Sequence, residues 1–166
     1  MVQLKKHHKG DDFTEYLYDS PLGKLLIVYE EDSIRGVYFN RDMTLDPELS
    51  VHNTILAQCI RELNEYFLGE RKSFDVPISP SGTEFQMSVW AALREIPYGQ
   101  TVSYGHIAKA IGKPAAVRAV GGANNKNPIS IVVPCHRVIG ADGKLVGYGG
   151  ELWRKEWLLD LEKKIK

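Results

Sequence analysis

The sequence predicts two domains, an α/β domain over residues 1–80 and a mostly helical domain over residues 83–166. Strand-like segments followed by one amphipathic helix occupy the first part, whereas helical patterns dominate the second. Residues 75–82 between them combine Pro, Ser and Gly, a composition typical of a linker. A chain of 166 residues is long enough for one large domain or two small ones.

In the first domain, apolar and β-branched runs predict strands over residues 15–18, 24–29 and 36–39. We expect a turn near Asp32 and Ser33. Apolar residues spaced three and four apart then predict a helix over residues 52–67. Cys59 belongs to this apolar stripe, so we interpret it as a core residue.

The second domain begins with a predicted helix over residues 83–95 and continues into a predicted helix-turn-helix. Ser103 is a candidate N-cap for a helix that Gly112 ends. A second helix over residues 115–123 carries one long side chain, Arg118, among small and β-branched ones. Small residues allow a partner to approach the backbone closely, although an ordinary packed helical hairpin fits the pattern equally well.

The last predicted helix covers residues 152–164. Its residues Trp153, Trp157 and Leu161 recur at helical spacing and would share one face. We expect that face to pack in the core.

Cys135 follows an apolar run, residues 129–133, that predicts a buried strand ending at Pro134. A thiol must ionise to attack carbon, and the neighbouring His136 and Arg137 are of the kind that raise the thiolate fraction. The alternative is a buried structural cysteine, and the Cys-His dipeptide alone favours that alternative.

Read together, the motifs strongly resemble the O6-alkylguanine-DNA alkyltransferase family, also called methylated-DNA–protein-cysteine methyltransferases. The spacing is unbroken from the turn at Tyr98 and Gly99 to the final helix. The family implies a ribonuclease-H-like first domain that supports a winged-helix-like second domain, which binds DNA and accepts the alkyl group. The matching segments are residues 85–89, 101–104, 116–123, 127–128, 131–138, 147–150 and 155–159.

The resemblance implies direct-reversal DNA repair. The protein would flip an O6-alkylguanine out of duplex DNA and transfer the alkyl group irreversibly to Cys135, with O4-alkylthymine as a further candidate substrate. A thioether has no activated carbonyl for water to attack, so each molecule would react once, as a stoichiometric S-methyltransferase. The expected partner is double-stranded DNA with an alkylated guanine, and the protein would be a monomer in the cytoplasm, or in the nucleus of a eukaryote.

By the same resemblance, Cys135 is the nucleophile, His136 its base through a water, and Glu162 the acid that orients the histidine. Tyr104 would donate its hydroxyl toward the purine, and Asn127 would brace the turn that carries the thiol. From the residues alone, Glu162 could also be a solvated carboxylate in a charged tail. Tyr104 could equally be an exposed aromatic residue at the start of a helix.

The family also assigns residues to the DNA. Arg118 would enter the base stack and fill the gap left by the flipped nucleotide, and its alternative role is a surface ion pair. The small-residue helix would lie in the minor groove, which is only about 6 Å wide. Gly149 stands where some relatives have a serine, so that hydroxyl contact is lost. The remaining implied DNA contacts are Ser103, Ala119, Gly121 and Gly122, and the implied base pocket is formed by Tyr104, Val138, Tyr148 and Gly149.

The net charge of zero conceals an uneven distribution. Residues 1–100 hold 10 Lys and Arg against 16 Asp and Glu, whereas residues 101–166 hold 11 against 5. The basic excess therefore coincides with the helix-turn-helix, as a phosphate-backbone partner requires, although a solvated Lys-rich end contributes to it.

We expect no cofactor, no membrane span and no zinc. The apolar runs are far shorter than the ~20 residues of a span. Some relatives bind zinc in the first domain through Cys and His, but Cys59 is the only cysteine there, and the adjacent His7 and His8 do not form a four-ligand site.

Three other classes of protein share parts of this pattern. A lesion-binding module would keep the fold but replace the cysteine, and Cys135 is present. A transcription regulator would need other recognition residues than alanine and glycine. A cysteine hydrolase would need an oxyanion hole and an acyl pocket, which nothing in the sequence indicates.

Overall fold

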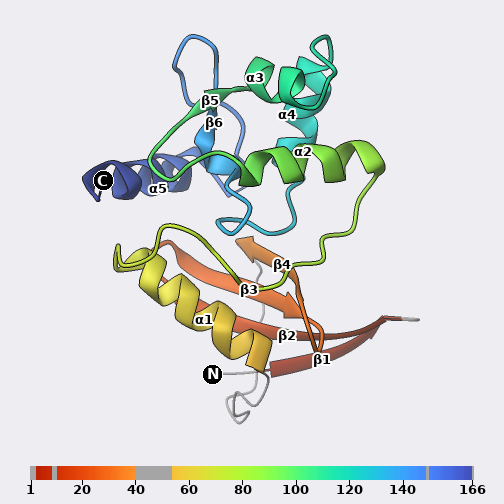
Figure 1. The fold of residues 1–166 in the computed structure, drawn as a ribbon. Coiled ribbons are helices and arrows are strands. Elements are labelled where there is room, and N and C mark those ends of the chain that lie inside the picture. Colours follow the sequence, from red (N-terminus) through yellow and green to blue (C-terminus); the bar gives the residue numbers. More distant parts are fainter. Residues whose placement is uncertain (1–2, 9–10, 40–53, 149, 166) are drawn as a thin grey trace. The chain divides into compact units, whose positions relative to one another are not determined.

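The computed structural model describes residues 3–8, 11–39, 54–148 and 150–165 (Figure 1). The chain divides into two compact units, Met1–Pro80 and Ser81–Lys166. The first holds a sheet with one helix and the second is mostly helical, so the predicted fold class is confirmed. Among the described residues, no helix combines the length and apolar character that crossing a membrane requires.

The first unit contains a four-stranded antiparallel sheet in chain order, formed by β1 (Gln3–His8), β2 (Asp11–Ser20), β3 (Gly23–Tyr29) and β4 (Ile34–Phe39). The last three contain the three predicted strands, and the predicted turn is closed by Glu30 N–H donating to the Ser33 carbonyl at 2.9 Å. β1 was missed because its Lys- and His-rich sequence has no apolar alternation.

Helix α1 (Thr54–Phe67) packs against β3 and β4, lying across the sheet in Figure 1. Its predicted first two residues, 52 and 53, lie outside the described residues. Leu56 and Leu63 are fully buried, and so is Cys59, as the apolar stripe predicts. Glu62 is buried on the same helix and was not expected there.

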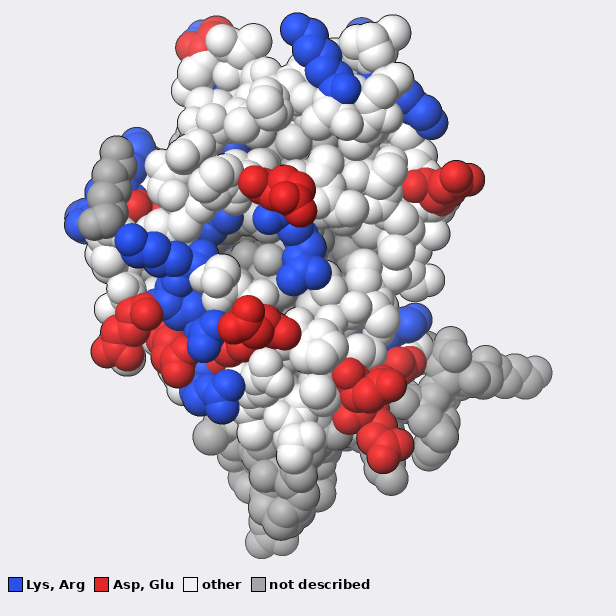
Figure 2. Space-filling view, viewed as in Figure 1, with Lys and Arg blue, Asp and Glu red and all other residues white. Residues whose placement is uncertain are grey.

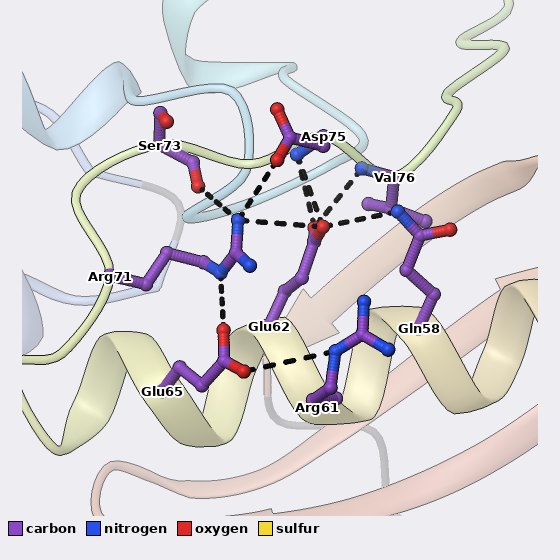
Figure 3. Close-up of polar contacts among 8 residues, drawn as sticks. All are labelled: Gln58, Arg61, Glu62, Glu65, Arg71, Ser73, Asp75 and Val76. Atoms are coloured by element: carbon purple, nitrogen blue, oxygen red, sulfur yellow. Dashed lines mark hydrogen bonds and ion pairs between the residues drawn. The ribbon is translucent and has the colours of Figure 1, made fainter.

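The buried Glu62 carboxylate anchors the segment that follows α1 (Figure 3). It accepts hydrogen bonds from the backbone N–H of Val76 at 3.0 Å and of Asp75 at 3.2 Å. Arg71 lies 3.6 Å from Glu62 and donates to Glu65 at 2.6 Å. Backbone donors and a cation together compensate the desolvation of the carboxylate.

The linker predicted over residues 75–82 is wrong in its first part. Val76 is buried, and Ile34 N–H donates to the Pro77 carbonyl while Ser79 N–H donates to the Ile34 carbonyl, both at 2.9 Å. Residues up to Pro80 therefore belong to the first unit. The composition suggested a loop, but these backbone groups pair with the start of β4.

Glu62→Gln is expected to lower the free energy of unfolding by about 2 kcal/mol, because an amide cannot accept from Asp75, Val76 and Arg71 together. Urea denaturation followed by circular dichroism measures the change. Glu70→Gln is the matched control, since Glu70 is exposed and a surface change of this type costs at most about 0.5 kcal/mol. Equal effects of both substitutions would contradict the anchoring role.

The second unit opens with α2 (Glu84–Arg94). This helix starts with a capping box, in which the side chains of Thr83 and Gln86 each accept from the backbone N–H of the other residue. After β5 (Val102–Ser103), helix α3 (Tyr104–Ala110) starts at Ser103, whose hydroxyl accepts from His106 N–H at 3.1 Å, as predicted for an N-cap. Gly112 follows α3 with a φ of +74°. The remaining elements are α4 (Val117–Asn125), the 3-10 helix η1 (Cys135–Arg137), β6 (Val138–Ile139), which pairs in parallel with β5, and α5 (Leu152–Lys164).

α4 begins two residues later and ends two residues later than predicted. A turn closed by Ala116 N–H donating to the Lys113 carbonyl at 2.9 Å precedes it, so helical bonding starts only at Val117. The sequence suggested an earlier start because Pro114 can open a helix.

The strand predicted over residues 129–133 is wrong. The segment is a tight turn in which Ile131 has a φ of +73° and Val133 N–H donates to the Ile129 carbonyl at 3.0 Å. Its apolar residues are buried, as the composition indicates. The backbone of the segment is held by local hydrogen bonds and by the Asn127 side chain, and not by a neighbouring strand. A short apolar run does not distinguish a strand from a buried turn.

The core face predicted for α5 is also wrong. Trp153 is 49% exposed, whereas Lys155 and Glu162 are at most 1% exposed. Leu158 and Leu159 complete the buried face. Arg154 is buried as well, whereas Trp157 and Leu161 are half-buried, so the buried face of α5 is not the one that the tryptophan pattern indicated. Buried charged groups of this kind are common at functional sites.

Candidate active site

Cys135 begins η1, directly after the buried turn, and is only 3% exposed. Asn127 holds this turn from both ends, because its Nδ2 donates to the Val133 carbonyl at 2.8 Å and its Oδ1 accepts from Ile129 N–H at 3.0 Å. Cys135 N–H donates to the Val133 carbonyl at 2.8 Å. The backbone on the N-terminal side of the thiol is thus fixed by the side chain that the resemblance singles out.

His136, which follows Cys135 in the chain, forms a buried pair with Glu162. The His136 Nε2 and a Glu162 oxygen are 2.5 Å apart, and both side chains are at most 1% exposed. Within the described part of the chain, His136 Nδ1 has no hydrogen-bond partner. Burial lowers the pKa of His136, and the contact with Glu162 offsets this only in part. The histidine is therefore a neutral imidazole with one nitrogen available to accept a proton.

Glu162 stays ionised in this environment. Burial raises the pKa of Glu162, but the hydrogen bond from His136 and the charges of His136 and Arg137 outweigh it, so that the net shift is downward. An ionised carboxylate on Nε2 fixes the tautomer of the ring, with the proton on Nε2 and the lone pair on Nδ1.

Arg137 does not approach the thiol in the way that the sequence suggests. Its Nε donates to Glu162 at 2.6 Å and its Nη1 to the Ile96 carbonyl at 2.8 Å. Burial raises the pKa of Cys135, while the Asn127 side chain, the charge of Lys155 and local backbone bonds act in the opposite direction. Thiolate formation at Cys135 consequently requires a base rather than a cationic neighbour alone.

Lys155 is the site residue that sequence reasoning missed. Its buried Nζ donates to the Val146 carbonyl at 2.9 Å and lies 5.9 Å from the Tyr104 ring centroid. Burial lowers the pKa of Lys155 to about 8, against the opposing effect of Cys135. Lys155 and Glu162 are seven residues apart and share one face of α5, a signal that the tryptophan pattern obscured.

Tyr104, half-buried at the start of α3, contacts the same loop. Its hydroxyl donates to the Val146 carbonyl at 2.8 Å. A Cβ added to Gly121 would lie 3.9 Å from the Tyr104 ring, and one added to Gly147 would lie 3.5 Å from its hydroxyl. Of the other expected pocket residues, Val138 is buried and Tyr148 half-buried, while Gly149 lies outside the described residues.

One face of helix α4 is exposed and carries mostly small side chains. Arg118 is exposed, and no hydrogen bond or ion pair joins it to a described residue. Ala119 and Gly122 are exposed, and a Cβ added to Gly122 would meet nothing within 4 Å. Figure 2 shows both basic and acidic side chains on the face that it draws.

The helix-turn-helix and the buried cysteine, histidine and glutamate define a class of protein that combines a nucleic-acid-binding type of fold with a nucleophile, a base and an orienting acid. Residues 84–164 match the family described as 6-O-methylguanine DNA methyltransferase, DNA binding domain. Residues 14–80 match the ribonuclease-like domain of the same description. The chain therefore belongs to the O6-methylguanine-DNA methyltransferase family.

Relatives cover almost the whole chain. A methylated-DNA–protein-cysteine methyltransferase of Methanosarcina acetivorans is 53% identical over 149 residues, which are 88% of this chain and 96% of that protein. The constitutive protein of Bacillus subtilis with this name is 47% identical over 87% of this chain and 92% of its own length. A crystal structure of Mycobacterium tuberculosis OGT in complex with DNA is similar with a TM-score of 0.79 and 48% identity, covering 89% of this chain and 91% of that one.

Proposed function

We propose that this protein repairs double-stranded DNA by transferring the alkyl group of O6-alkylguanine to its own Cys135. The observation that carries the proposal is the buried His136–Glu162 pair beside Cys135, in a unit that matches the DNA binding domain of the family. The curated relatives are named for methyl transfer from DNA to a protein cysteine, which supports the same reaction here. O4-alkylthymine is a second substrate to test.

The reaction begins with the transfer of the thiol proton through a water to His136 Nδ1, while Glu162 stabilises the imidazolium that forms. The Cys135 sulfur attacks the alkyl carbon in line, and the bond from that carbon to O6 breaks with its electron pair remaining on oxygen. A proton returns to the purine, which leaves guanine and an S-alkylcysteine. The hydrogen of the thiol thus replaces the alkyl group on the base.

Tyr104 lowers the cost of the charge that develops on the purine by donating its hydroxyl to the ring. In the free protein this hydroxyl donates to the Val146 carbonyl, so it must exchange that acceptor for the substrate. Asn127 keeps the turn in place during the attack. Val138, Tyr148 and Gly149 complete the base pocket.

The protein reacts once. The thioether has no activated carbonyl carbon for water to attack, and none of the described residues around Cys135 is placed as a second nucleophile. The alkylated protein is therefore an end product, and the protein is consumed in proportion to the lesions it repairs.

The target base leaves the stack before it reaches the thiol, because Cys135 is buried inside the second unit and the reacting atom faces the interior of duplex DNA. Arg118 fills the gap, and Ser103, Ala119, Gly121 and Gly122 allow the close approach of the DNA backbone. Residues 83–166 form the DNA-binding and acceptor domain, residues 1–80 support it, and a monomer suffices because all named groups come from one chain.

Incubation with duplex DNA carrying O6-methylguanine labelled in the methyl group tests the proposal. The label should move to the protein covalently, reach one equivalent per molecule and stop there. Mass spectrometry of peptides should locate it on Cys135. Binding without transfer of label would indicate a lesion-binding module, and continuous release of labelled product would indicate a turnover enzyme.

A further inference from the structure

The Glu162 carboxylate contacts the His136 imidazole with one oxygen and the Arg137 guanidinium with the other. His136 Nε2 contacts one oxygen at 2.5 Å, whereas Arg137 Nε donates to the other at 2.6 Å. Gly99 N–H also donates to this second oxygen, at 3.3 Å. The charge of Glu162 is thus divided between the histidine and the guanidinium, all within the buried interior of the second unit.

The guanidinium of Arg137 is held in place by groups other than Glu162. Its Nη1 donates to the Ile96 carbonyl at 2.8 Å, just after the end of α2. Its central carbon lies 5.6 Å from the centroid of the Tyr98 ring, within the range of a cation–π contact. Arg137 is only 6% exposed, so solvent screens its charge weakly.

The charged groups that face His136 shift its pKa in opposite directions. Glu162, from α5, favours the imidazolium, whereas Arg137, from η1, and Lys155, from α5, disfavour it. An unshared buried carboxylate at 2.5 Å would hold a proton on the ring. A protonated His136 has no lone pair on Nδ1 and cannot accept the proton of Cys135.

We propose that Arg137 is a positioning residue that keeps His136 a neutral base by taking part of the Glu162 charge and fixing the carboxylate at Nε2. The proposal rests on the alkyl transfer proposed above. It gives Arg137 a function in setting the pH range of the reaction, acting through Glu162 and His136 without contact with the substrate.

Arg137→Gln tests the proposal through the pH profile of the reaction with free O6-benzylguanine, which needs no extrusion from DNA. The acid limb of the rate should move to higher pH, so that the variant is about tenfold slower than the wild type near pH 6 and approaches it at alkaline pH. Arg137→Lys, which retains the charge, should restore the position of the limb. A purely structural role would lower the rate equally at every pH.

Arg154→Gln is the matched control. Arg154 is also a buried arginine of the second unit that donates to a backbone carbonyl, that of Gly150 at 2.8 Å, and lies over an aromatic ring, that of Trp153 at 4.6 Å. Arg154 lies eight residues before Glu162 on α5, and the side-chain hydrogen bonds described for the Glu162 carboxylate involve His136 and Arg137. The position of its acid limb should match that of the wild type.

NMR titration of His136 in the protein without substrate separates this proposal from the proposed function. The midpoint in the wild type should lie below the ordinary 6.5 of histidine and should rise in Arg137→Gln. A wild-type midpoint above 6.5, or an unchanged midpoint in a folded variant, would overturn the positioning role. Failure of the wild type to take up alkyl groups would overturn the proposed function and leave this titration interpretable.

Discussion

Cys135→Ala is expected to abolish alkyl transfer to the protein and to leave binding of modified duplex DNA intact. The substitution removes the sulfur that forms the new bond, and no other described group beside His136 is a soft nucleophile. No covalent label should be detectable on the variant, because His136 and Glu162 remain but the sulfur that accepts the alkyl group is gone. Measuring both covalent label and affinity for O6-methylguanine duplex separates chemistry from binding.

Cys59→Ala is the matched control, since Cys59 is the other cysteine of the chain and is fully buried in the first unit. Burial raises the pKa of Cys59 to about 12, with a further contribution from Glu62, so its thiol stays protonated. This variant should be less stable, by about 1 kcal/mol for the small cavity, but should still take up one equivalent of label. Label on Cys59 in the Cys135→Ala protein would show that the nucleophile is assigned wrongly.

The sequence predicted the ends of helices correctly where the hydrogen bonds that form those ends join residues within a few positions of each other. Ser103 was identified as an N-cap and Gly112 as a helix end because both roles depend on bonds within one turn. The start of α2 follows the same rule, with Thr83 and Gln86 three residues apart. The turn over residues 129–133 failed, since Asn127 and local backbone bonds replace the strand partner that an apolar run suggests.

The residues of the candidate site were predicted from the resemblance to the alkyltransferase family, whereas the electrostatics of the site were not predicted. The sequence places Arg137 beside Cys135, but only the fold brings the ends of α2 and α5 to its guanidinium, so its contact with Glu162 was not predictable. Lys155 was missed for a similar reason. A lysine on a helix is usually solvated. Lys155 is buried here because its ammonium group donates to the Val146 carbonyl, which lies in a loop outside α5.

Arg118→Ala is expected to slow the repair of duplex DNA on the order of 100-fold. Extrusion of a paired base costs a few kcal/mol, and the loss of a side chain that fills the vacated stack leaves about 3 kcal/mol of this cost uncompensated. Arg118 is exposed and has no hydrogen bond or ion pair to any described residue, so its removal should not disturb the fold. Single-turnover rates with O6-methylguanine duplex measure the effect.

The charge of Arg118 must be separated from its place in the stack. Lys126→Ala removes one positive charge from the C-cap of the same helix, where the side chain is also exposed. Both variants should weaken non-specific DNA binding to a similar degree, because each loses about one phosphate contact. Only Arg118→Ala should slow the transfer once the duplex is saturated with protein.

Free O6-benzylguanine decides which step Arg118 serves. This substrate needs no extrusion and depends on the groups around Cys135, among them His136, Glu162 and Tyr104, so Arg118→Ala should react with it at nearly the wild-type rate. His136→Ala and Glu162→Ala remove the base or its orienting acid and should be slow with both substrates. If Arg118→Ala loses the same factor on the free base as on the duplex, the arginine supports the active site or the fold, because a residue that acts only by occupying the base stack has no means of affecting a reaction without DNA.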